Sequence, residues 1–430
     1  SKTAIPQGIV SSNLTASALI RYTVLTMAFK TPVPAACAEC GDGAIFHRLN
    51  YISIVIDEFL AGIFGSAPGG PARKPTKTSL FLNGIERYLT PFVLEFFISI
   101  RAADRVTAPD DETQLLALMI WNEAKARGIV VEEFRLAGLP RNIFLARYPN
   151  GKRIAYEGIP LPIADNARVA WMDNKSILKK EFTKLGIPVA KGGTARTLAG
   201  AKKIMHSVTP PVIVKPYSGS ASRHTVLHVM TDAELESAFR IATQVAPRAV
   251  VEEELVGPVY RATVVDGKLV AVLRRDQPYV MGNGKSTIAE LVECANTHPK
   301  RQGPYFHHIQ LNEVADAELA WQSLTRESVP PEGLRVTLHQ KVNWSVGGTT
   351  CDVTDEVHPD NVALFEEATR VLGATISGID FIINDISRSW KEQERCGILE
   401  CNSMPFFDNH HLPFEGEPRN VAGAIWDMNA

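Results

Sequence analysis

Hydrophobic and polar residues in the middle of the chain alternate with the periods of short strands and amphipathic helices. The pattern predicts three helices over 174–186, 197–208 and 231–245, and an apolar strand over 210–219. Gly186 is expected to end the first helix, because glycine tolerates the left-handed backbone found at helix ends. Thr231 or Asp232 is placed to begin the last helix as its N-cap. The alternation indicates a small α/β unit over residues 166–249.

The parts of the chain on either side follow different patterns. Before this unit, residues 1–165 contain loops rich in glycine, proline and alanine, a predicted helix and a predicted hairpin, over 112–128 and 144–158. After it, residues 250–430 contain a hairpin, a polar and mostly helical stretch, a helix and two strands, predicted over 260–275, 285–330, 359–373, 377–385 and 397–402. We therefore expect an N-terminal domain (1–165), a central domain (166–249) and a C-terminal domain (250–430).

Composition excludes several classes of protein. The chain has 430 residues, 21% of them charged, and a formal net charge of −2, which argues against a nucleic-acid partner or an anionic membrane. We find no apolar run of the roughly 20 residues needed to span a bilayer and no signal peptide, so a cytoplasmic location is expected. Cys37 and Cys40 have CxxC spacing, but no second pair follows, and two reduced thiols are expected rather than a zinc site.

Acidic and amide side chains near the C-terminus suggest a metal site. Glu400 and Asn402 are two residues apart in the predicted strand "GILECN", so both side chains point to one face. If the segment over 386–396 forms a long hairpin, Asp380 lies on the adjacent strand and three oxygen donors converge, as Mg²⁺ requires. The alternative is a pair of strands with unrelated polar residues, with Glu400 in water.

Two further segments allow both a functional and a structural interpretation. Lys215 closes an apolar strand before the small-residue loop "YSGSASR", where a lysine and free backbone N–H groups could bind phosphate. The alternative is a surface lysine. In "VVEEELVG", Glu252 ends a strand, as it would in a clamp for adenine, or it lies in a solvated acidic turn.

Taken together, these motifs resemble the ATP-grasp superfamily, and in particular the ATP-grasp part of cyanophycin synthetases. The resemblance covers residues 166–430 and rests on motifs in the family's order: "DNKSILKKEFTKLGIPV", "VIVKPYSGSASR", "VEEELVGPVYRATVVDGKLVAV", "NWSVGGTTCDVTDEVHPDN", "SGIDFIIND" and "ILECNSMP". It implies an ATP-grasp fold of the α/β (α+β) class. The N-terminal domain would be followed along the chain by a small central lid domain and a C-terminal ATP-binding domain.

The resemblance also implies roles for individual residues in binding ATP and Mg²⁺, with Mn²⁺ as a substitute. ATP phosphates would contact Lys175, Lys215 and a loop containing Ser218, Gly219 and Ser220. Adenine would contact Glu252, Glu253 and Leu255. The metal would be bound by Asp380, Glu400 and Asn402. The groups near the phosphate or acyl phosphate would be Arg275, Asn343, Gly347 and Gly348.

The sequence departs from the family at several positions. Val259 stands where relatives carry an acidic residue for the ribose. Met404, Phe406 and Asp408 replace residues near the metal motif, where the acyl substrate should lie, and His410 matches a histidine in the relatives. We expect these four residues to contact a substrate other than the cyanophycin chain. We also expect the second, Mur-ligase-like domain of those synthetases to be missing.

The resemblance implies a ligase that joins a carboxylate to an amine through an acyl phosphate, releasing ADP and phosphate. A stand-alone peptide or amino-acid ligase of specialised metabolism is expected, with small-molecule or peptide substrates. The oligomeric state stays open, although relatives commonly form homo-oligomers. Val259 and the changes over 404–408 motivate an alternative, an ATP-binding module without turnover. A third outcome is a kinase-like reaction whose phosphorylated product leaves without an amine.

Overall fold

The computed structural model describes residues 47, 51, 90, 92–136, 142–162, 165, 169–217 and 224–429. The chain divides into two compact units. Unit 1 comprises Ser1–Arg73 and Ala190–Val256, and unit 2 comprises Lys74–Val189 and Gly257–Ala430. The three-domain division expected from the sequence stays a prediction. Among the helices in these described ranges, none has the length and apolarity needed to cross a membrane.

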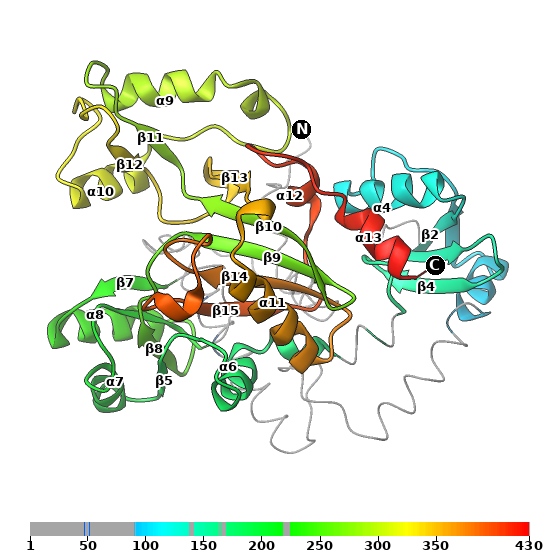
Figure 1. Cartoon of the computed structure of the whole chain (residues 1–430), viewed down its shortest axis with the longest axis horizontal. Helices are drawn as coiled ribbons and strands as arrows, with labels where there is room; N and C mark the ends of the chain where they lie inside the picture. The colour runs from blue at the N-terminus through cyan, green and yellow to red at the C-terminus, as the bar shows by residue number, and fades with distance from the viewer. Residues whose placement is uncertain are drawn as a thin grey trace, which may run out of the picture. The chain divides into compact units, whose positions relative to one another are not determined.

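The described part of unit 1 is an antiparallel sheet covered by two helices (Figure 1). Its strand order is β5-β8-β6-β7, with bounds Gly192–Ala195, Ala249–Glu253, Val212–Pro216 and Val226–Val229. Helices α7 (Leu198–Met205) and α8 (Asp232–Ala242) pack against the sheet. Thr231 begins α8 through a reciprocal capping box with Glu234, which confirms the predicted N-cap.

Unit 2 is built around a five-stranded antiparallel sheet (Figure 1). Its order is β13-β10-β9-β14-β15, with bounds Thr349–Asp352, Lys268–Asp276, Val259–Val265, Ile376–Ile382 and Gly397–Asn402. The predicted hairpin is β9 and β10, joined at Asp266 and Gly267, which both have positive φ. Helix α11 (Pro359–Leu372) covers one face, where Phe365 packs edge-on against Phe381.

A second antiparallel sheet in unit 2 lies in the N-terminal half of the chain. Its order is β1-β2-β3-β4, with bounds Ala103–Val106, Val130–Leu136, Ile143–Arg147 and Arg153–Glu157. Helices α4 (Leu115–Ala126) and α13 (Val421–Met428) pack together, and the indole N–H of Trp426 donates to the carbonyl of Ile120. One apolar cluster joins these helices to both sheets, so burial ties the C-terminal helix to the N-terminal half.

The polar stretch after β10 forms a small module with its own core. It contains β11, β12, α9, α10 and the 3-10 turn η2, with bounds Tyr279–Met281, Arg335–Thr337, Ile288–Asn296, Glu313–Trp321 and Pro299–Gln302. The core contains buried residues such as Val280, Ile288 and Leu338. Short helices complete unit 2: η1 (Ala170–Asp173), α6 (Lys175–Lys184), η3 (Trp344–Val346), η4 (Thr354–Glu356), η5 (Trp390–Glu392) and α12 (Asp408–His411).

Candidate active site

Strand register brings charged side chains together on the face of the five-stranded sheet opposite Phe381. Asp380 of β14 pairs with Glu400 of β15 on one side and with Arg261 of β9 on the other. Gly378 pairs with Asn402, so the amide lies in the next row. The sequence-based prediction that Asp380 and the Glu400–Asn402 pair occupy adjacent strands is confirmed. We call Arg261, Arg275, Asp380, Glu400 and Lys175 the charged face.

Asp380 is held between two guanidinium groups. Arg261 donates to both of its carboxylate oxygens, at 2.5 Å from Nε and 3.1 Å from the second nitrogen, and Arg275 approaches to 3.5 Å. The side chain of Asp380 is 8% exposed. Burial disfavours its charge, but the two arginines outweigh burial and hold the pKa of Asp380 below its ordinary value. The two arginines therefore favour the anionic form of Asp380.

Glu400 and the end of β15 are tied to the start of α6. Lys175 Nζ lies 2.8 Å from the Glu400 carboxylate. Two residues earlier, Asp173 accepts hydrogen bonds from the backbone N–H and the hydroxyl of Ser403, at 2.9 and 2.8 Å. Burial raises the pKa of Asp173, whereas the Ser403 bonds lower it. Asp173 thus fixes the backbone next to Asn402.

The donors on this face fit a hard cation. Asp380 and Glu400 offer carboxylate oxygens. The amide nitrogen of Asn402 donates to the Gly378 carbonyl, which leaves the amide oxygen of Asn402 as an acceptor. Oxygen-only donor sets of this kind suit Mg²⁺. In the described ranges no three His, Cys, Asp or Glu side chains are grouped to hold a metal, so the amide is needed as third donor. Metal binding stays a prediction.

Lys215 and Glu252 form an ion pair across β6 and β8 of unit 1. Glu252 is only 1% exposed. The sequence-based alternative of a solvated acidic turn at Glu252 is therefore wrong, whereas the side chain of Lys215 is 24% exposed and its two interpretations stay open. Glu253 accepts a hydrogen bond from the Lys191 backbone at 2.9 Å, and Leu255 is buried. Their contacts with ATP stay predictions, and Ser218, Gly219 and Ser220 lie outside the described residues.

Close backbone contacts explain why both residues after η3, Gly347 and Gly348, are glycines. Gly347 has φ +96, and a Cβ placed there would lie 2.8 Å from the Ile309 backbone. At Gly348 a Cβ would lie 2.8 Å from the carbonyl oxygens of Asp276 and Asn343. The Asn343 side chain accepts from the Ser345 N–H at 3.0 Å and caps η3. The predicted roles of Asn343, Gly347 and Gly348 near an acyl phosphate remain predictions.

The predicted substrate segment runs along the charged face. Pro405 packs against Gly378, where a Cβ would come within 2.5 Å. Phe406 is 44% exposed, whereas Asp408 and His410 are buried. His410 shares a 2.8 Å hydrogen bond with Thr263 Oγ1, and burial lowers the pKa of His410 to about 3. Burial raises the pKa of Asp408.

One side chain of this segment reaches the N-terminal half of the chain. The end of the Met404 side chain lies 3.1 Å from a Cβ placed on Gly158, which follows β4. The substrate contacts of Met404, Phe406, Asp408 and His410 stay predictions.

Sequence reasoning missed two residues of this site. Arg261 was not singled out because its pairing with Asp380 depends on β9 lying beside β14, which are 119 residues apart in the chain. The only available signal was a charged residue inside an apolar strand, where burial requires a partner. Asp173 stands two residues before the lysine that begins α6, and its partner Ser403 is 230 residues away.

Comparison with known proteins identifies the fold. No protein-family model matches the chain. The cyanophycin synthetase of Trichormus variabilis is 33% identical over 321 residues, which cover 72% of this chain and 36% of that protein. The solved structure of a bifunctional glutathione synthetase from Pasteurella multocida matches with a TM-score of 0.56 and 26% identity, over 73% of this chain and 43% of that chain. The chain has the ATP-grasp fold.

This ATP-grasp chain also resembles the glutathione biosynthesis bifunctional protein of Clostridium perfringens, at 31% identity over 272 residues, or 60% of this chain and 34% of that protein. The predicted resemblance to the ATP-grasp portion of cyanophycin synthetase and the predicted α+β fold are confirmed. The chain spans about a third of the length of the curated relatives it matches, so their complete activities do not carry over to it.

Proposed function

We propose that the protein is an ATP-dependent carboxylate–amine ligase that works through an acyl phosphate. A substrate carboxylate oxygen attacks the γ-phosphorus of ATP, and the bond to the β,γ-bridging oxygen breaks to release ADP. The amine nitrogen then attacks the acyl carbon, the bond to phosphate breaks, and the nitrogen loses a proton to give the amide. The observation that carries the proposal is the charged face, where Arg261, Asp380 and Glu400 lie side by side on three neighbouring strands and Lys175 pairs with Glu400.

The chain's own residues would act by positioning and by neutralising charge. Lys175 and Arg275 lie beside the carboxylates and would offset negative charge on the phosphates. Arg261 would keep Asp380 ionised and in place, and Asp173 would fix the end of β15. Asp380, Glu400 and Asn402 would hold Mg²⁺, which supplies further charge neutralisation when bound. Lys215 and Glu252 would contact the nucleotide, as the ATP-grasp resemblance implies.

Substrates are proposed to be small-molecule or peptide carboxylates and amines, since the similar proteins are named as cyanophycin and glutathione synthetases. A role as a peptide or amino-acid ligase of specialised metabolism, a cytoplasmic location and a homo-oligomeric state are part of the same proposal. A second candidate, an ATP-binding module without turnover, is favoured by Val259, which offers no polar atom to a ribose from its position on β9.

The test is release of ADP and phosphate from Mg·ATP with pools of amino acids and dipeptides, followed by mass measurement of the product. A carboxylate labelled with ¹⁸O should transfer one labelled oxygen to inorganic phosphate, because the acyl-phosphate route breaks the bond from carbonyl carbon to that oxygen. An amide without this transfer would overturn the acyl phosphate. Tight ATP binding without turnover on any pool would support the second candidate, and a phosphorylated product without amine would indicate a kinase-like reaction.

A further inference from the structure

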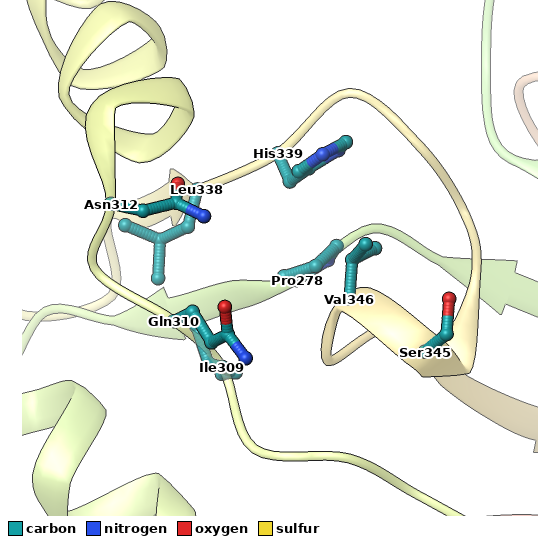
Figure 2. A pocket seen from close by; sticks show the side chains of 8 residues that line it. All are labelled: Pro278, Ile309, Gln310, Asn312, Leu338, His339, Ser345 and Val346. Atoms are coloured by element: carbon teal, nitrogen blue, oxygen red, sulfur yellow. The ribbon is translucent and has the colours of Figure 1, made fainter. Parts of the chain in front are cut away.

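A small cavity lies between the module that follows β10 and the turn η3 (Figure 2). Its volume is about 60 Å³. Ile309, Leu338 and Val346 give it apolar walls, with Pro278 at one side. A site for one water needs roughly 10–15 Å³ on the same measure, so the cavity holds a group of about four or five non-hydrogen atoms. It is therefore suited to the end of a side chain rather than to a nucleotide.

Four polar side chains also line the cavity, and each has a hydrogen-bond donor to offer. They are Gln310, Asn312, His339 and Ser345, and they come from three separate segments (Figure 2). Within the described part of the chain, none of these four side chains donates a hydrogen bond. No acidic or basic side chain other than the histidine lines the cavity.

Hydrogen bonds to backbone N–H groups determine which atoms of Asn312 and His339 can donate into the cavity. The Asn312 amide oxygen caps α10 by accepting from the backbone N–H groups of Val314 and Ala315, at 3.1 and 3.2 Å. Its nitrogen is left for the cavity. His339 Nδ1 accepts from the Lys341 N–H at 2.9 Å, so a neutral ring carries its proton on Nε2. Burial lowers the pKa of His339, and Lys341 lowers it further, so the ring is neutral near pH 7.

The cavity is joined to the proposed active site by the chain itself. Ser345 and Val346 belong to η3, which leads through Gly347 and Gly348 into β13. In β13, Thr350 pairs with Arg275 of the charged face. A substrate that reacts at the charged face and extends past the glycine turn would thus place its far end at the cavity.

We propose that this cavity is a specificity site for the far end of the carboxylate substrate, and that it takes a short aliphatic arm ending in hydrogen-bond acceptors, a carboxylate or a carboxamide. The inference rests on the proposed ligase function for its role in turnover. The donors complement acceptor oxygens, and the apolar walls complement the methylene groups. An ammonium end is disfavoured, because it would bring further donors to the Asn312 and His339 donors, although the Gln310 and Ser345 oxygens could accept from it.

Binding of small probes tests the site without ATP. The probes are propionate, propionamide and n-propylammonium at millimolar concentration, as suits ligands of this size, with saturation-transfer NMR on the full chain as the measurement. Propionate or propionamide should bind, and n-propylammonium should not. A preference between the first two identifies the end group as carboxylate or carboxamide. Equal or tighter binding of n-propylammonium would overturn the proposal.

Asn312→Asp is the decisive variant, because an aspartate keeps the cap on α10 and replaces the amide donor by a carboxylate oxygen. Probe affinity should fall about tenfold or more, since a donor is lost and a negative charge gained. The melting temperature should stay close to that of the parent chain. The matched control is Asn283→Asp, since Asn283 accepts similar backbone bonds from Lys285 and Ser286 away from the cavity. Unchanged probe binding in Asn312→Asp would contradict the assignment.

Turnover separates this inference from the proposed function. If a ligase substrate is found, Asn312→Asp should raise its KM about tenfold while kcat changes less than about twofold, because the cavity is remote from the reacting atoms. A fall in kcat with unchanged KM would overturn the specificity role. If no amide forms with any pool, the ligase proposal fails, while the probe measurements still decide whether the cavity binds acceptor groups.

Discussion

The charged face and the cavity at η3 lie in the same unit but differ in how their polar groups are paired. On the charged face each carboxylate already has a cation beside it, with Asp380 bound by Arg261 and Glu400 by Lys175. The cavity's neutral donors have no partner in the described residues. Buried charges must be paired in the folded protein whether or not a ligand is present, whereas neutral donors open to water need no partner. Changes to the charged face should therefore affect folding and function, and changes to the cavity function alone.

The largest expected effect is on turnover in Asp380→Asn. The change removes one proposed metal donor and leaves two guanidinium groups without their anion. ADP release at saturating ATP should fall by about 10² to 10³. The measurement is the initial rate against Mg²⁺ and Mn²⁺ concentration, with circular dichroism to show that the variant is folded.

Two further variants complete this test. Glu400→Gln, at a more exposed position, should also lower the rate of ADP release and raise the metal concentration needed for half-maximal rate. Asp316→Asn is the matched control, because Asp316 is bound by an arginine on the surface, at 2.6 Å from Arg326. A rate in Asp380→Asn that equals the control would remove the metal assignment.

The second prediction concerns stability. Arg261→Met removes both short bonds to the buried carboxylate of Asp380 and leaves the longer contact to Arg275 as its cation. Breaking a buried pair from one side should lower the free energy of unfolding by about 3–5 kcal/mol, measured by urea denaturation. Arg326→Met, which breaks an exposed pair, should lower the free energy of unfolding much less, because water screens the attraction. Equal losses in the two variants would show that the charged face is no more dependent on pairing than the surface.

The comparison also shows what the sequence could and could not predict. The Asp380–Glu400 contact was predictable because the two strands form a hairpin and side chains alternate with a period of two. The capping box of α8 was predictable from Thr231 and Glu234 for a similarly local reason. Local rules of this kind fixed most helices and hairpins, and motif resemblance supplied the superfamily.

What could not be predicted depends on distant contacts. Arg261 becomes part of the charged face only because β9 lies between β10 and β14. The cavity takes Asn312 and His339 from loops and Ser345 from η3, and no periodicity describes how these segments pack. Asn312 and Ser345 look like ordinary loop polar residues, and their free donors appear only once their backbone bonds are known. Such a site has no sequence signal.

The third prediction uses pH to examine the helix that covers the charged face. His410 has a pKa of about 3 in the folded protein and an ordinary value of 6.5. Between these values the unfolded chain binds a proton that the folded chain does not, so stability falls as pH drops below 6.5. From about pH 7 to about pH 5 the loss due to this group is about 2 kcal/mol.

The measurement is the unfolding free energy at both pH values in the parent chain and in His410→Gln. The variant should have the weaker pH dependence. Asp408, whose raised pKa acts in the opposite direction, is present in both chains and cancels in the difference. If stability depends on pH to the same extent in His410→Gln and in the parent chain, the buried ring binds its proton at the same pH in the folded and unfolded chains.

The smallest expected effect is on stability in Lys175→Gln, and it sharpens the comparison within the charged face. The side chains of Lys175 and Glu400 are 44% and 30% exposed, so water screens their attraction. Losing this ion pair should change the free energy of unfolding by less than about 1 kcal/mol. The KM for ATP should nevertheless rise, because Lys175 is proposed to contact phosphate. A large loss of stability with an unchanged KM would make Lys175 a structural residue like Arg261 and would place the phosphate contact elsewhere.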